Sequence, residues 1–187
     1  MASETLTGFT YDDLLELPDD GRHYEILDGE LIVNASPIPR HQRVAFRLAS
    51  ILDAYVEANR IGLIYTALDV VFTQQWVVEP DILYISNARK SIIKQTNVVG
   101  APDLAVEVLS DSTRKRDEVI KRKAYEDFGV DEYWIVDPLL ESFKIYRRNA
   151  SGRYERAFDI STETEGAMIT SPLFPELQIS LARVFAE

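Results

Sequence analysis

The chain has 187 residues, of which 46% are hydrophobic, and this length is typical of one globular domain with a sizeable core. It has no cysteine and only two histidines, which excludes disulfides and thiolate or multi-histidine metal sites, so any metal should be a hard ion held by carboxylates. The net charge of −11 argues against non-specific coating of nucleic acid, although it leaves room for a local basic groove.

Neither a membrane span nor a secretion signal is expected. No apolar run is long enough to cross a bilayer, and the first residues lack the basic and apolar segments of a signal peptide. We therefore expect a cytoplasmic protein without a membrane partner.

The N-terminal part predicts a short helix and a β-hairpin. Thr10 to Asp13, followed by leucines, has the pattern of a capped helix start. The segment YEILDGELIV predicts two strands joined by a two-residue turn of the primed type at Asp28-Gly29. Pairing across this turn places Glu25 and Glu30 on the face opposite Tyr24, so one face should pack and the other is mixed.

A helix is predicted from about residue 40 to residue 58. His41 lies on its apolar side, where a core or capping role is the common one. The apolar stripe consists of Val44, Leu48, Ile51, Leu52 and Tyr55. Arg40, Arg43 and Arg47 form a separate basic stripe. This stripe has two readings that stay open, a solvated face or an edge that contacts phosphates.

The patterns that follow predict strands at residues 62–73 and 76–86, joined as a hairpin, with Asp69 interrupting the first and Asp81 the second. After the central stretch described next, a strand at 133–136 and a hairpin of residues 142–148 and 153–160 are predicted. The chain should end with a short helix capped by Ser180.

The central stretch, residues 103–109, is almost continuously apolar, as expected for a strand covered on both faces. One carboxylate, Glu107, interrupts it. Burying an ionised carboxylate without a partner costs several kcal/mol, so Glu107 needs a cation nearby. Asp103 has the same parity along the strand and should point to the same face, although it lies at the strand entrance.

A second helix is predicted at about residues 114–128, ended by a glycine. Ile120, Ala124 and Phe128 should form its buried line. Asp117, Lys121 and Tyr125 follow each other at i, i+4 and i+8 in a neighbouring row. Lys121 is thus expected at the boundary of the buried face, where its ammonium can reach over the sheet.

These residues can be combined into a reactive site. Asp81 and Glu107 on neighbouring strands could hold one Mg²⁺ or Mn²⁺ ion, which would keep several waters. Such an ion lowers the pKa of a bound water, and Lys121 could stabilise the charge that develops on a phosphate. A metal ion held by carboxylates and a nearby lysine are the groups that metal-dependent phosphodiester hydrolysis requires. The alternative is a structural ion pair between Glu107 and Lys121, and the residues alone do not decide between the two.

The sequence resembles the Uma-two family, formerly a domain of unknown function, which is similar to the PD-(D/E)XK restriction-endonuclease-like superfamily. The resemblance covers nearly the whole chain. It rests on DGRHYEILDGELIV, SPIPRHQRV, LDVVF, EPDILYIS, GAPDLAVEVLSDSTRKRD, GVDEYWIVDP, SPLFPEL and the spacing of Lys121 and Tyr125.

The resemblance implies one α+β domain over residues 1–187. Its restriction-endonuclease-like core would have a mixed β-sheet flanked by helices, with an N-terminal β-hairpin and a C-terminal β extension. The superfamily motif would fall on Pro80-Asp81 and on Glu107 to Leu109. Leu109 stands where the superfamily has lysine, and Lys121 matches the position to which the family's lysine has moved. Asp111 stands in a turn where the family usually has proline.

The function implied is that of a Mg²⁺-dependent endonuclease that cuts DNA, working as a homodimer because cutting both strands often uses paired sites. Asp81 and Glu107 would bind the metal, Lys121 would be the catalytic lysine, and His41 and Glu25 are candidate accessory residues. The candidate nucleic-acid-binding residues are Arg40, Arg43, Arg47, Arg114, Lys115 and Arg116. The alternative is an inactive nuclease-fold module for binding or assembly.

Overall fold

The structure is a computed structural model that describes residues 8–18, 20–110 and 112–186. It begins with helix α1 (Tyr11–Leu15), whose N-terminus is closed by a capping box between Thr10 and Asp13, as predicted. The predicted hairpin follows as β1 (His23–Leu27) and β2 (Glu30–Asn34), with positive φ angles at Asp28 and Gly29.

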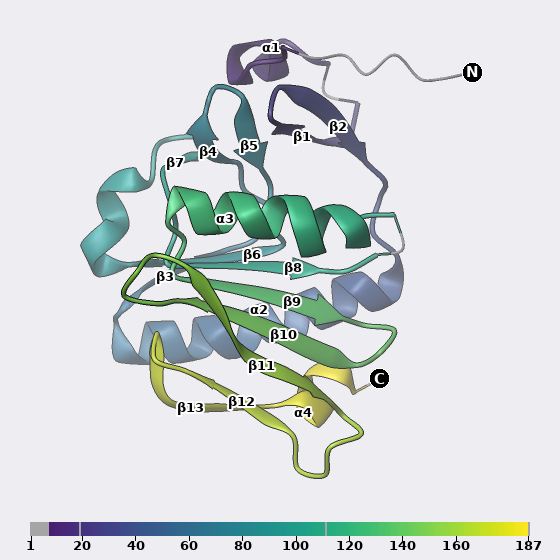
Figure 1. Cartoon of the computed structure of the whole chain (residues 1–187), viewed down its shortest axis with the longest axis vertical. Coiled ribbons are helices and arrows are strands. Elements are labelled where there is room, and N and C mark those ends of the chain that lie inside the picture. The colour runs from purple at the N-terminus through teal and green to yellow at the C-terminus, as the bar shows by residue number, and fades with distance from the viewer. Residues whose placement is uncertain (1–7, 19, 111, 187) are drawn as a thin grey trace.

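A mixed six-stranded sheet forms the centre of the molecule, in the order β11-β10-β9-β8-β6-β3 (Figure 1). Its strands are β3 (Gly62–Tyr65), β6 (Ile82–Ser86), β8 (Leu104–Val108), β9 (Glu132–Asp137), β10 (Ser142–Arg148) and β11 (Tyr154–Ser161). β3, β6 and β8 form an antiparallel meander, and β8 then pairs in parallel with β9. Every residue of β8 is buried, as its apolar run predicted. The restriction-endonuclease-like order of helix, meander, helix and strand is confirmed.

The two long strands predicted at 62–73 and 76–86 were wrong in extent, because each is divided between two sheets. The halves next to the turn between them are β4 (Val70–Thr73) and β5 (Trp76–Val78). These belong to a five-stranded sheet in the order β2-β1-β5-β4-β7. One of its two edge strands is β7 (Val98–Val99), which is preceded by the 3₁₀ helix η1 (Asn87–Ile92). The first strand is interrupted before Val70, at Asp69, and the second at Pro80. Proline interrupts a strand because it has no N–H to donate to a ladder.

Helices cover both faces of the six-stranded sheet (Figure 1). α2 (Pro39–Asn59) packs on one face through the predicted apolar stripe, together with the C-terminal helix α4 (Leu181–Phe185). The helical segment made of η2 (Arg116–Lys121) and α3 (Arg122–Phe128) lies on the other face, where Tyr125 joins the second core. Glu107 has the parity of Ala105 and Leu109, so it points to this second face.

The second helix spans the predicted residues, but its buried face differs from the prediction. η2 is a π-helical turn, and Ile120 in it is 42% exposed instead of buried. Asp117 and Lys121 are buried in its place. A π turn closes i→i+5 hydrogen bonds and thus holds one extra residue, which turns Ile120 outwards and the charged row towards the sheet.

The C-terminal tail contains a hairpin that the sequence patterns did not predict, β12 (Met168–Ser171) and β13 (Phe174–Ser180). It leads into α4, which has Ser180 at its N-cap position as expected, although the Ser180 side chain makes no capping hydrogen bond with the described residues. Among the described residues, no helix combines the length and apolar character that a membrane crossing requires. The architecture is the α+β fold that the sequence predicted, with mixed sheets flanked by helices and a C-terminal β extension.

Candidate functional site

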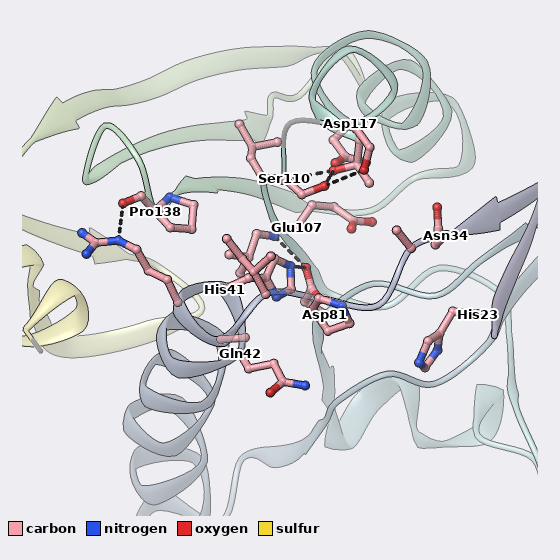
Figure 2. Close-up of a pocket in the computed structure, with 18 of the residues that line it drawn as sticks. His23, Asn34, His41, Gln42, Asp81, Glu107, Ser110, Asp117 and Pro138 are labelled. Atoms are coloured by element: carbon pink, nitrogen blue, oxygen red, sulfur yellow. Dashed lines mark hydrogen bonds and ion pairs between the residues drawn. The ribbon is translucent and has the colours of Figure 1, made fainter. Parts of the chain in front are cut away.

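Asp81 and Glu107 come together because β6 and β8 are neighbouring antiparallel strands. Ile82 pairs with Val106, and extending this register by one residue sets Asp81 opposite Glu107. The Val108 backbone N–H donates a 2.7 Å hydrogen bond to Asp81 Oδ2, which fixes the carboxylate at the end of β6. Both carboxylates line one cavity of about 750 Å³ (Figure 2).

Lys121 lies at the centre of a buried group of charges. Its Nζ is 2.7 Å from Glu25 Oε1, 3.0 Å from Glu107 Oε1 and 3.4 Å from Asp117 Oδ1. These four residues, which we call the Lys121 cluster, are each at most 4% exposed. The cluster thus joins β1, β8 and η2, and three carboxylates share one ammonium group.

Two tyrosines complete the surroundings of the Lys121 cluster. The Tyr125 hydroxyl donates a 2.7 Å hydrogen bond to Glu107 Oε1, and the Tyr133 hydroxyl donates a 3.0 Å bond to the Asp117 carbonyl. Glu107 Oε1 therefore accepts two hydrogen bonds, one from Lys121 and one from Tyr125. Its other oxygen accepts no hydrogen bond from the described residues, so it is available to a ligand in the cavity.

The electrostatics of the cluster follow from burial and from the excess of carboxylates. Burial raises the pKa of Glu107 well above its ordinary value, and the charges of Asp117, Glu25 and Asp81 add to this although Lys121 opposes it. Burial alone would lower the pKa of Lys121, but its carboxylate neighbours hold this pKa well above the usual range. Lys121 is therefore a permanent cation in a region that carries surplus negative charge.

Glu25 is held by contacts to several elements. Besides Lys121, its side chain accepts hydrogen bonds of 2.9 Å from the Asn34 side-chain amide and from the Glu79 backbone N–H. It is fully buried on the hairpin face that the sequence left uncertain. The candidate accessory residue Glu25 thus touches Lys121 directly.

His41, the other candidate accessory residue, lies beside Asp81. Its Nε2 is 3.3 Å from Asp81 Oδ2, and Figure 2 shows the two side chains pointing toward each other. Burial would lower the pKa of His41, but the hydrogen bond and charge of Asp81 outweigh it and raise this pKa. Asp81 Oδ2 is therefore engaged by His41 and by Val108, while Oδ1 accepts no hydrogen bond from the described part of the chain.

The six candidate phosphate-binding cations are not gathered in one place. Two of them, Arg40 and Arg114, line the cavity, and both form 2.6 Å ion pairs, with Glu141 and Asp137 respectively. Arg116 donates to the Asn34 side-chain oxygen. Of the described residues that line the cavity, none is Arg43, Arg47, Lys115 or Arg116.

Asp103 and Leu109, two other residues of the central stretch, differ in their relation to the cavity. Asp103 does not line the cavity among the described residues; it accepts a 2.7 Å bond from the Ser86 N–H and lies near Arg89. Leu109 is buried in the second core and contributes to the cavity wall. Asp111 lies outside the described residues. Asp117 is a site residue that the sequence analysis did not predict, although its i, i+4 spacing to Lys121 is a signal for it.

The donor set of the cavity suits a small hard cation. Mg²⁺ is bound by one or two carboxylates together with waters and substrate phosphate oxygens. Asp81 and Glu107 each have one oxygen to which none of the described residues donates. Within the described residues, no three His, Cys, Asp or Glu side chains form a metal-binding group. The site therefore fits an ion that completes its shell with water and substrate.

Comparison with known proteins identifies the family. A family model described as "Uma2: Putative restriction endonuclease" matches residues 11–182, so the chain belongs to the Uma2 family. A crystal structure described as that of "a putative nuclease belonging to DUF820" from Anabaena variabilis has the same fold, with a TM-score of 0.78. It is 22% identical and the match covers 95% of this chain and 98% of that one. No curated protein matches the sequence.

Proposed function

We propose that this protein hydrolyses phosphodiester bonds in DNA with a Mg²⁺ (or Mn²⁺) ion bound by Asp81 and Glu107 and with Lys121 as the catalytic lysine. The observation that carries the proposal is that one cavity is lined by two carboxylates from neighbouring strands and by a buried lysine. Membership of the Uma2 family supports nuclease activity.

The ion would supply two things, neutralisation of phosphate charge and a bound water of lowered pKa. Asp81 and Glu107 would hold it through the oxygens that no described residue engages. Val108 and His41 would keep the Asp81 carboxylate from rotating, and Tyr125 would do the same for Glu107. The ligand oxygens are thus oriented before the ion binds.

Lys121 would act on the phosphate. Since its carboxylate neighbours keep it protonated, it can donate a hydrogen bond to a phosphate oxygen as negative charge develops there. A water molecule releases a proton to solvent as its oxygen forms the new bond to phosphorus. The bond from phosphorus to the leaving ester oxygen breaks, and that oxygen takes up a proton from solvent. The products are a phosphate monoester and a free hydroxyl group.

A second candidate function, a nuclease-fold module without catalysis, is favoured by one observation. Lys121 already has three carboxylate partners within 3.4 Å, which is how a purely structural buried cation would be satisfied. In that case the cluster would stabilise the fold, and the cavity would bind a partner without cutting it.

Calorimetric titration with Mn²⁺ separates the two functions. We expect the wild type to bind Mn²⁺, and Glu107→Gln and Asp81→Asn to lose at least about tenfold in affinity. Asp103→Asn is the matched control, because it changes a buried carboxylate of the same β8 region that does not line the cavity. Circular dichroism would confirm that each variant folds.

DNA cleavage is then measured for the wild type and for Lys121→Met. If Mn²⁺ binds and Mg²⁺ supports cleavage that Lys121→Met abolishes, the nuclease proposal stands. Equal Mn²⁺ affinity in wild type and Glu107→Gln would contradict it, and no binding in either would favour the non-catalytic module.

A further inference from the structure

The reactive residues lie deep in the cavity. Glu107 and Lys121 are only 4% and 3% exposed, whereas some of the other side chains that line the cavity are largely exposed. A phosphate must therefore enter the cavity to reach them. A base that enters the cavity with this phosphate must be unpaired, because the bases of a duplex are stacked and paired, and enzymes that enclose a base act on single strands or on extruded nucleotides.

Exposed apolar side chains line the cavity beside exposed polar ones such as Arg40 and Gln42. Ile38, Phe46 and Leu139, which we call the rim, are 61%, 65% and 74% exposed and all line the cavity. Large exposed apolar side chains that line a cavity often mark a binding site. The rim thus offers contacts to something flat or apolar that enters with the phosphate.

One stripe of α2 connects the rim to the interior. Gln42, Ala45, Phe46 and Ala49 follow each other at helical spacing and all line the cavity. Phe46 is the exposed aromatic side chain of this stripe, so a base that enters the cavity can lie against its ring. Stacking of a base on an aromatic side chain contributes about 1–3 kcal/mol and is tolerant of sequence.

The cavity is poor in free positive charge. Its two arginines, Arg40 and Arg114, are each paired with a carboxylate at 2.6 Å, and the chain carries a net charge of −11. A protein that binds duplex DNA typically neutralises several phosphates at once. Here the affinity for a nucleic acid must come largely from stacking, which unpaired bases offer and paired bases do not.

We propose that the cavity accepts unpaired nucleotides, so that the substrate is single-stranded DNA or a single-stranded stretch of it, with Phe46 as the stacking residue. This inference rests on the proposed function, because it takes the phosphate at Asp81 and Glu107 as the bond to be cut. It adds the substrate class and a residue that determines it.

Fluorescence anisotropy tests the proposal with a labelled DNA oligonucleotide of about 16 nucleotides, single-stranded or annealed to its complement. Ca²⁺, which also takes oxygen ligands, replaces Mg²⁺, and a gel verifies that the DNA stays intact. We expect the single strand to bind at least about tenfold more tightly than the duplex. Phe46→Ala should weaken single-strand binding about tenfold, and Phe46→Trp should preserve it.

Val119→Ala is the matched control, because Val119 is 54% exposed but is not among the described residues that line the cavity. It should leave the affinity unchanged. Phe46→Ala should fold normally, since the ring is 65% exposed and alanine favours helices. Equal affinity for single strand and duplex, or no effect of Phe46→Ala, would overturn the proposal.

Two further measurements assign a failure to its cause. If Phe46→Ala shifts a dimer to monomers in sedimentation while DNA affinity is unchanged, the rim is an interface between copies of the chain and the proposal is overturned. Mn²⁺ titration of Phe46→Ala should match the wild type. Absence of Mn²⁺ binding in the wild type would overturn the metal-dependent function, whereas intact Mn²⁺ binding with a duplex preference would overturn the substrate class alone.

Discussion

Lys121 is the residue on which the buried charges of this molecule converge. Glu25, Glu107 and Asp117 reach it from three elements, and each of them is at most 4% exposed. A buried carboxylate is tolerated only when a cation compensates it, and removal of one partner leaves the others uncompensated. The lysine should therefore contribute to stability as well as to the proposed reaction.

Lys121→Met should lower the free energy of unfolding by about 3–5 kcal/mol at neutral pH. The loss should shrink towards about pH 5, because burial raises the pKa of Glu107 and of Asp117 and protonation removes their charges. Urea unfolding at both pH values measures this. Lys123→Met is the control, since Lys123 forms an exposed ion pair with Asp127, and an equal loss in both variants would contradict the prediction.

Asp69 offers a second test at the scale of a residue. Burial and then the charge of Glu79 raise its pKa to about 6. Because the folded-state value lies above the unfolded one, the group favours folding when protonated, below about pH 4, and this contribution is lost as the pH rises through about 6.

Asp69→Asn should therefore raise the free energy of unfolding at neutral pH by about 1–2 kcal/mol, since solvent screens the half-buried carboxylate. The gain should vanish near pH 4, where the wild-type carboxyl is protonated. Urea unfolding across this pH range measures the difference. A variant that is less stable than the wild type at neutral pH would contradict the assignment.

At the scale of elements, the π turn η2 decides which face of its helix is buried. It places Asp117 and Lys121 against the sheet and leaves Val119 and Ile120 exposed. In a regular α-helix successive residues are about 100° apart, so one residue more or less in this turn changes which side chains face Glu107.

Deletion of Ile120 should convert η2 to a regular α-helix and move the Asp117 carbonyl away from the Tyr133 hydroxyl. We expect the loss of this buried hydrogen bond to cost about 1–3 kcal/mol in urea unfolding, whereas Asp117 and Lys121, then at i and i+3, stay neighbours. Ile120→Ala keeps the residue count and changes an exposed side chain, so it should cost less than about 1 kcal/mol. A deletion no more harmful than the substitution would show that the turn has no such role.

At the scale of the whole molecule, the distribution of charge determines how the protein binds nucleic acid. The net charge of −11 repels a polyanion, and the two arginines of the cavity wall are paired with carboxylates. The site can therefore neutralise few phosphates, and binding should depend only weakly on salt.

The slope of log affinity against log salt for single-stranded DNA should be about −1.4, since each contacted phosphate contributes about −0.7 and the wall offers two arginines. Anisotropy titrations at increasing salt measure it. A slope steeper than about −4 would instead indicate an extended basic surface that includes Arg43 and Lys115.

Much of the fold could be predicted because its signals are local. The alternation of the hairpins, the continuous apolar run of β8 and the caps of α1 and of the helix at 114–128 depend on neighbouring residues. The same run marked Glu107 as a carboxylate in need of a cation, and the row at i and i+4 supplied Lys121. The family resemblance then agreed with the family model that matches residues 11–182.

Only the tertiary structure decided which charges meet. Glu25 reaches Lys121 from the N-terminal hairpin, and Arg40 and Arg114 are paired with acidic residues distant in sequence, Glu141 and Asp137. No local pattern encodes such pairs, because their energy depends on separation and on burial, and both are set by how sheets and helices pack. The division of two predicted strands between two sheets has the same origin, since pairing partners are chosen by the packed molecule and not by the segment.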